Sequence, residues 1–183
     1  IYIGEDNITK VSEKHLLEKR REFGIVFQGG ALFDSLTVEE NVGFFLKENL
    51  KLPPDEVHRK VVEELEYLGL ADFLDYYPAQ LSGGMAKRVA VARAVISNPN
   101  TMLYDEPTAG LDPITCQRVV DLITQLHGEQ KMTSVIVTHE IHYFVSTVKR
   151  MIMLRAGKIV YDGPPVDDIH KMYDKVDVPD AAP

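Results

Sequence analysis

The sequence is most informative at Leu81-Ser82-Gly83-Gly84-Met85-Ala86-Lys87-Arg88-Val89-Ala90-Val91-Ala92-Arg93-Ala94, where two glycines precede a basic, alanine-rich segment. Ser82 is a good N-cap residue, and the alanine-rich segment predicts a helix that runs to about Ser97. Glycines leave backbone N–H groups uncovered, and a helix N-terminus carries partial positive charge, so this loop is suited to contact phosphate oxygens.

Two neighbouring acids follow a short apolar run at Thr101-Met102-Leu103-Tyr104-Asp105-Glu106. Such a run predicts a buried parallel strand that carries both carboxylates at its C-terminal end. Ligands of open α/β sheets bind at that edge. Taken alone, the segment is equally compatible with a strand that runs into an acidic turn.

Three more candidate residues follow predicted strands or begin a helix. Gln28 comes after the apolar run Phe23–Phe27, and His139 comes after the run Thr133–Thr138. Asp112-Pro113 is a good N-cap and N1 pair, which predicts a helix over 113–130.

Together these segments resemble the motifs of ABC-type ATPases, in the order that the family has them. The resemblance implies that Ser82, Gly83 and Gly84 form the signature loop, which contacts the ATP of a facing subunit. It implies that Asp105 and Gln28 hold Mg²⁺ and that Glu106 orients the attacking water. By the same resemblance, His139 is the switch histidine, and Asp112 lies in a loop that crosses the dimer interface.

One motif of the family is missing from these 183 residues. No segment matches G-x-x-x-x-G-K-[ST], the P-loop that cradles phosphates, and Gly157-Lys158 lies in a predicted hairpin. We therefore expect the chain to be the C-terminal part of an ATPase domain, and we expect these residues alone not to hydrolyse ATP.

Composition is that of a globular domain, with 45% apolar and 26% charged residues. The predicted fold class is α/β, a P-loop NTPase core of mostly parallel sheet and flanking helices with an inserted helical subdomain. We place the core at 1–36 and 98–173, the helical subdomain at 37–97 and a polar tail at 174–183. The net charge of −8 does not favour nucleic-acid binding. The basic cluster 87–93 is interpreted as a helix face.

The resemblance also implies partners and a location. We expect ATP and Mg²⁺ as ligands and a second ATPase subunit that forms a homodimer. We also expect a permease to bind the loop after Gln28, because the run 29–33 has no evident role inside the domain. The protein would then lie on the cytoplasmic face of the plasma membrane.

The most specific expectation concerns the cargo. The run Gly30-Ala31-Leu32-Phe33 and Met85 resemble ATPases of Mla-type lipid transporters, which implies phospholipid transport with an MCE-domain partner. The alternatives are an importer of a polar solute such as an amino acid, or a scaffold without catalysis. Intact Glu106, His139 and Ser82 favour an enzyme over a scaffold.

Overall fold

The computed structural model describes residues 1–166, and contacts divide the chain into one unit that ends at Thr138 and another that begins at His139. The predicted helix over 165–173 falls almost wholly outside the described residues, and the tail 174–183 falls entirely outside them. In the first unit the α-helices are α1 (Glu13–Arg20), α2 (Val38–Glu48), α3 (Pro54–Tyr67), α4 (Gly83–Val95) and α5 (Pro113–Gln130). Its strands are β1 (Tyr2–Ile3), β2 (Asp6–Asn7), β3 (Phe23–Val26), β4 (Thr101–Asp105) and β5 (Thr133–Val137).

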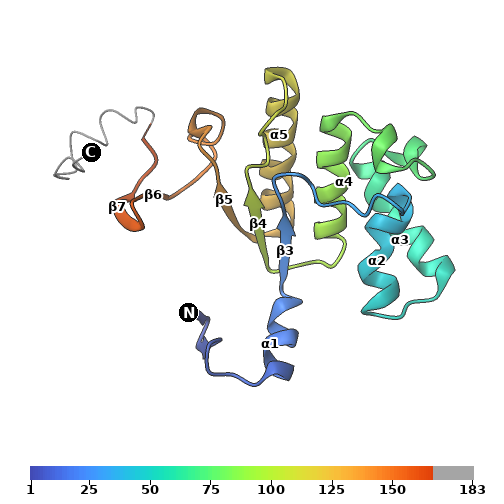
Figure 1. The fold of residues 1–183 in the computed structure, drawn as a ribbon, viewed down its shortest axis with the longest axis horizontal. Coiled ribbons are helices and arrows are strands. Elements are labelled where there is room, and N and C mark those ends of the chain that lie inside the picture. Colours follow the sequence, from blue (N-terminus) through green and yellow to red (C-terminus); the bar gives the residue numbers. More distant parts are fainter. Residues whose placement is uncertain (167–183) are drawn as a thin grey trace. The chain divides into compact units, whose positions relative to one another are not determined.

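The centre of the first unit is a three-stranded parallel sheet in the order β3-β4-β5. Parallel neighbours require long crossover connections, which are supplied here by α2, α3 and α4 between β3 and β4, and by α5 between β4 and β5 (Figure 1). All three strands therefore end at the same edge of the sheet. This arrangement confirms the predicted α/β class.

The strand predicted from the apolar run 23–27 is present as β3, but only one of its faces is packed. Gly24 and Val26 are buried, whereas Ile25 and Phe27 are 42% and 44% exposed. The packed face lies against α4, which approaches so closely that a Cβ on Gly24 would lie 2.8 Å from the Ala94 carbonyl oxygen. The strand β5, which pairs with the other side of β4, also alternates, with Val135 and Val137 exposed.

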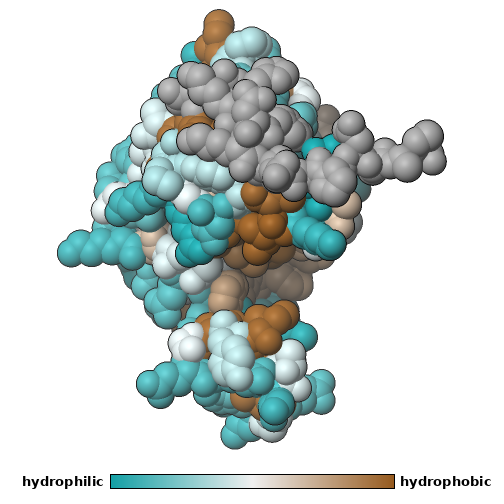
Figure 2. All heavy atoms as spheres, turned by 90° about the vertical axis from the view of Figure 1, so that its left-hand side faces the viewer, coloured by the Kyte–Doolittle hydropathy of each residue, from teal (hydrophilic) through white to brown (hydrophobic). Residues whose placement is uncertain are grey.

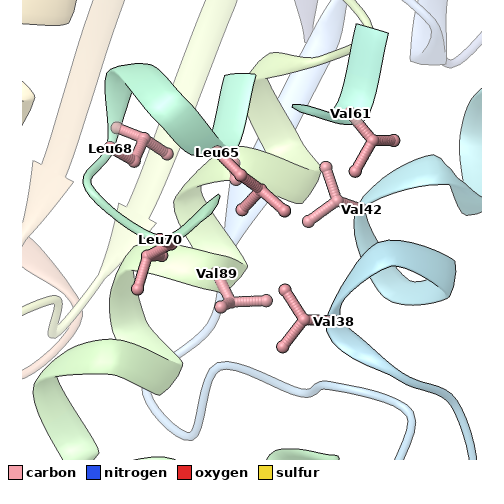
Figure 3. Packing of buried hydrophobic residues seen from close by; sticks show 8 residues of the cluster. Val38, Val42, Val61, Leu65, Leu68, Leu70 and Val89 are labelled. Atoms are coloured by element: carbon pink, nitrogen blue, oxygen red, sulfur yellow. The ribbon is translucent and has the colours of Figure 1, made fainter. Parts of the chain in front are cut away.

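The helices α2, α3 and α4 enclose a hydrophobic core of their own (Figure 3). Its buried members are Val38, Val42, Val61, Leu65, Leu68, Leu70, Val89 and Ala92. Thr37 begins α2 with the predicted capping box, since its hydroxyl accepts from Glu40 N–H and the Glu40 carboxylate accepts from Thr37 N–H. Short 3₁₀ turns at Ala71–Phe73 and Pro78–Gln80 lead into α4.

The second unit contains a 3₁₀ turn, Ile141–Tyr143, and the antiparallel hairpin β6 (Met151–Arg155) and β7 (Lys158–Gly163). This confirms the hairpin predicted around Gly157-Lys158, and its turn is formed by Ala156 and Gly157. Arg150 and Asp162 form a bidentate ion pair beside it, with N···O distances of 2.7 and 2.6 Å.

Large apolar side chains are exposed in both units. Ile152, Leu154 and Ile159 are 50–68% exposed on the hairpin. On the face drawn in Figure 2, brown hydrophobic residues lie among teal hydrophilic ones. In the part of the chain that the structure describes, no helix is both long and apolar enough to cross a bilayer.

Candidate nucleotide-binding edge of the sheet

The register of the sheet brings three candidate residues to the same edge, with Gln28 level with Glu106 and Asp105 one residue before them. Val26 pairs with Tyr104, and Asp105 pairs with Val137. Gln28 and Glu106 each follow the Val26–Tyr104 pair by two residues, just after the ends of the adjacent strands β3 and β4. Asp105 is the last residue of β4, and its side chain is exposed, as is that of Gln28. The structure therefore places an amide and two carboxylates at the C-terminal edge of the sheet, where ligands of open α/β folds bind.

Glu106 is fixed from several directions. Its N–H donates to the Val137 carbonyl at 2.8 Å, and Thr138 Oγ1 donates to its carboxylate oxygen Oε2 at 3.1 Å. Its φ of +45° lies in the left-handed region, which is costly for a residue with a side chain and persists where the surroundings hold it. A half-buried carboxylate in a strained backbone conformation is typical of functional sites.

His139 directly follows Thr138 and is the first residue of the second unit. The structure thus places it immediately after the C-terminal end of β5, as the sequence predicts. Its proposed role remains an expectation from the resemblance.

The glycine loop begins α4 as predicted. Ser82 is the N-cap, and its Oγ accepts a hydrogen bond from Met85 N–H at 3.3 Å. Gly83 is exposed, whereas Gly84 is buried against α5, where an added Cβ would lie 2.4 Å from Thr115 Cγ2. Gly84 is therefore required by the close approach of the two helices.

Asp112 is the N-cap of α5, with Pro113 at N1, which confirms the predicted cap. Its carboxylate accepts bonds from the N–H groups of Ile114 and Thr115, both at 3.1 Å, and from Thr115 Oγ1 at 2.5 Å. The side-chain bond from Thr115, with the backbone bonds, lowers the pKa of this exposed carboxyl. Asp112 and Gly84 thus share Thr115 as a neighbour.

The predicted basic helix face at 87–93 is wrong for its main members. Lys87 is only 7% exposed, and its ammonium donates to the carbonyls of Gln28 and Glu106, the latter at 3.3 Å. Arg88 donates to the Leu68 carbonyl at 2.9 Å. The helical spacing contains a signal for this burial, because Ala90 and Val91, three and four positions after Lys87, are core residues.

The loop after Gln28 has clear roles within its own unit, contrary to the expectation for 29–33. Arg93 donates to the carbonyls of Gly30 and Ala31 at 2.9 and 2.7 Å, and its guanidinium lies 5.6 Å from the Phe33 ring centroid. Buried Asn41 binds the N–H and the carbonyl of Phe33. Nevertheless the side chains of Phe33 and Phe44, whose ring centroids lie 4.8 Å apart, are 43% and 38% exposed.

A parallel sheet with an acidic pair at its C-terminal edge, beside a helix that begins at two glycines, is the arrangement of a nucleotide-binding α/β protein. The chain belongs to the ABC transporter family, whose sequence model matches residues 1–109.

Relatives with known names agree with this family. The chain is 39% identical over 159 residues to the methionine import ATP-binding protein MetN of Lactobacillus johnsonii, with 87% of this chain and 45% of that protein covered. It is 37% identical over 163 residues to methionine import ATP-binding protein MetN 2 of Bacillus cereus, with 89% and 48% covered. The chain thus spans about half the length of these curated relatives.

Solved structures show the same fold. CbiO1 of Clostridium perfringens, part of the ABC transporter complex cbiONQ, matches with a TM-score of 0.80 at 31% identity, covering 90% of this chain and 65% of that one. The ATP-binding cassette MJ0796, a dimer in a post-hydrolysis state with ADP and Pi, matches with a TM-score of 0.78 at 32% identity, covering 90% and 72%.

Proposed function

We propose that this chain belongs to the ATP-hydrolysing subunit of an ABC importer whose cargo is an amino acid such as methionine. The observation that carries the enzymatic part is the meeting of Gln28, Asp105 and Glu106 at one sheet edge. The cargo is supported by the methionine importers among the relatives. This replaces lipid transport as the leading interpretation, because neither of these relatives is named for a lipid.

The residues at the edge have the chemistry that Mg²⁺ and ATP require. Asp105 and Gln28 offer exposed carboxylate and amide oxygens, the hard donors that Mg²⁺ prefers. When bound, Mg²⁺ would neutralise charge on the phosphates. Phosphoryl transfer needs little more from a protein than positioned charge and an aligned water molecule.

Each proposed residue has a distinct task. Glu106 accepts a hydrogen bond from the attacking water and polarises it, while the bond from Thr138 holds the carboxylate in place. His139, after the end of β5, contacts the terminal phosphate. Ser82, Gly83 and Gly84 supply the hydroxyl and helix N-terminus that face the ATP of a second subunit, and Asp112 stands beside that contact.

Two partners and a location complete the proposal. A second copy of the ATPase subunit would close the ATP sites, and the dimeric cassette with ADP and Pi supports this. A permease would bind the exposed aromatic side chains Phe33 and Phe44 in the loop after Gln28 and its neighbouring helix. The subunit would then lie on the cytoplasmic face of the plasma membrane.

A second candidate cargo keeps one specific observation in its favour. The run 30–33 and Met85 resemble Mla-type lipid ATPases, in which an MCE-domain protein would be a further partner. Both features support this candidate through the resemblance alone, since Met85 lies in the first turn of α4 and the run 30–33 in the loop after Gln28.

The catalytic proposal is tested with the full-length protein and its Glu106→Gln variant. The variant keeps the size of the side chain but removes the base, and loss of a general base lowers kcat by about 100-fold or more. We expect wild-type ATP turnover, and a variant that binds ATP without hydrolysing it. Equal turnover by both proteins would disprove the role of Glu106, and absence of turnover in both would favour the scaffold.

The cargo is tested in proteoliposomes that contain the ATPase subunit and its permease. ATP-dependent movement of radiolabelled methionine, absent with Glu106→Gln, is the expected result. Movement of labelled phospholipid in place of methionine would favour the lipid candidate.

A further inference from the structure

Lys87 is a buried lysine that joins two segments of the candidate site. It lies in α4, one turn after the glycines, and only 7% of it is exposed. Its ammonium donates to two backbone carbonyls, that of Gln28 after β3 and that of Glu106 after β4, the second at 3.3 Å. One side chain of α4 therefore contacts the backbone of both residues whose side chains are proposed to hold the metal ion and the water.

The burial of this cation has an energetic cost. Desolvation lowers the pKa of Lys87, while the nearby charges of Asp105 and Glu106 oppose that shift. An apolar side chain of the same length would fill the space without this cost, as replacements of buried charges often show. Packing alone therefore does not account for a lysine at this position.

The carbonyl of Glu106 is a place where such a donor matters. The left-handed φ of +45° turns this peptide group away from the path of an ordinary strand. The Glu106 N–H is held by Val137, and its carboxylate is held by Thr138. The carbonyl accepts from Ala109 N–H at 3.2 Å, and Lys87 adds a second donor there whose ammonium also binds the Gln28 carbonyl.

We propose that Lys87 is a positioning residue for ATP hydrolysis, whose ammonium binds the Gln28 and Glu106 carbonyls and so holds the two side chains in one catalytic arrangement. The proposal rests on the proposed ATPase function. It goes beyond that function by coupling the loop after Gln28 to the acidic pair through the signature helix. A displacement of α4 would thereby be transmitted to both residues at once.

The test compares two substitutions in the full-length protein. Lys87→Met keeps the apolar stem and removes every donor, whereas Lys87→Gln keeps an amide donor on a chain shorter by one bond. Lys47→Met is the matched control, because Lys47 is an exposed lysine in the last turn of α2. For each protein the kcat and KM for ATP and the melting temperature are measured.

We expect Lys87→Met to lower kcat by about 10-fold or more, since small misplacements of catalytic groups are costly in rate. The KM for ATP should change by less than about 3-fold, because uniform binding is not altered. Lys87→Gln should give an intermediate kcat at a similar melting temperature, and Lys47→Met should equal the wild type. A kcat for Lys87→Met equal to that of the wild type would overturn the proposal. Equal losses of kcat in Lys87→Met and Lys87→Gln, accompanied by equal losses of melting temperature, would also overturn it.

Amide hydrogen exchange tests the contact independently of catalysis. Lys87→Met should increase exchange in the segments 28–31 and 106–110, and Lys87→Gln should increase it less. Unchanged exchange in both segments would overturn the positioning role, whether or not the wild type hydrolyses ATP. Absence of ATP hydrolysis by the wild type would count against the proposed function and not against the Lys87 contacts. Should Lys87→Met fail to fold, Lys87→Gln decides, and a wild-type kcat for that variant would refute the proposal.

Discussion

Glu106 combines a costly backbone conformation with a carboxylate fixed by a neighbouring hydroxyl. Its φ is +45°, and Thr138 Oγ1 donates to its Oε2 at 3.1 Å. A hydrogen bond of this kind restricts the rotation of the carboxylate, so one oxygen keeps a constant direction. The hydroxyl of Thr138 is thus a further candidate for the positioning of the base.

Thr138→Val tests that hydroxyl with little change of volume. Loss of the donor frees the Glu106 carboxylate, and we expect kcat for ATP to fall by about 10-fold while KM changes little. Steady-state ATPase assays on the full-length protein give both constants. The control is Thr124→Val, where the hydroxyl donates to the Val120 carbonyl within α5, and there we expect wild-type kinetics. Equal kinetics of Thr138→Val and the wild type would exclude this role.

The positions of the candidate residues could be predicted from the sequence, but their restraints could not. Strand ends and caps depend on local patterns, so the sequence places Glu106, Ser82 and Asp112 correctly. The left-handed backbone of Glu106 and the carbonyl contacts of Lys87 arise from segments far apart in the chain. No local pattern encodes such contacts, although the helical spacing of Lys87 with core residues indicates its burial.

At the scale of the elements, the junction of α4 and α5 depends on one glycine. A Cβ on Gly84 would lie 2.4 Å from Thr115 Cγ2, well inside van der Waals contact. We expect Gly84→Ala to lower the free energy of unfolding by about 1–3 kcal/mol, as overpacking generally does. Thermal or urea unfolding measures this change.

A second glycine provides the matched control. Gly128 lies in α5, and a Cβ built on it would have no atom within 4 Å. Gly128→Ala should therefore raise the free energy of unfolding by about 0.5–1 kcal/mol through helix propensity. If both alanine variants changed stability in the same direction, the close approach of α4 and α5 would not be the cause.

Asn41 connects α2 to the loop that precedes it. The side chain is fully buried, accepts from Phe33 N–H at 2.8 Å, and donates to the carbonyls of Phe33, Leu36 and Thr37. This role could not be predicted from the sequence, because an asparagine within a helix is ordinarily expected to be exposed to solvent.

Asn41→Leu should lower the free energy of unfolding by about 3 kcal/mol, because it leaves buried backbone groups without partners. Urea unfolding gives the number, and hydrogen exchange at Phe33 shows whether the loop is released. Asn49→Leu, at the exposed C-cap of the same helix, should change stability much less. Equal losses at the two positions would show that the network around Asn41 does not stabilise the fold.

At the scale of the whole molecule, the described contacts divide the chain after Thr138, a different boundary from the predicted division at 37 and 97. The helices α2 and α3 have the apolar core expected of an inserted subdomain, yet α4 belongs both to that core and to the sheet. Hydrophobic periodicity predicts that each helix has an inward face. It does not predict that one helix, α4, packs both against the helical core and against the sheet.

The stability of the molecule should depend on pH through Glu64. This residue of α3 lines an open pocket of about 390 Å³ with Lys60, Glu63, Tyr67 and Glu129. In the described part of the chain, no partner lies within hydrogen-bonding distance of its Oε1. Burial raises the pKa of Glu64 from 4.5 to about 6, so the folded state binds this proton more tightly than the unfolded state.

The sign of the effect follows from that direction. The raised pKa favours folding while the group is protonated, and this contribution is lost as the pH rises through 6. Glu64→Gln should therefore leave stability unchanged at about pH 4 and below, where the carboxyl is protonated in both states, and raise it by up to about 2 kcal/mol at about pH 8. Urea unfolding across this range measures the difference, with exposed Glu66→Gln as the control. A gain that does not vary with pH would contradict the assignment.

Thr115 has its methyl group beside Gly84 and its hydroxyl on the carboxylate of Asp112. One side chain therefore braces the first turn of α4 against the first turn of α5. The glycine loop and the loop before α5 are therefore held together by one residue, and we expect them to move as one unit. We therefore expect a displacement of the glycine loop to move the loop before α5 as well, although the two loops are far apart in the sequence.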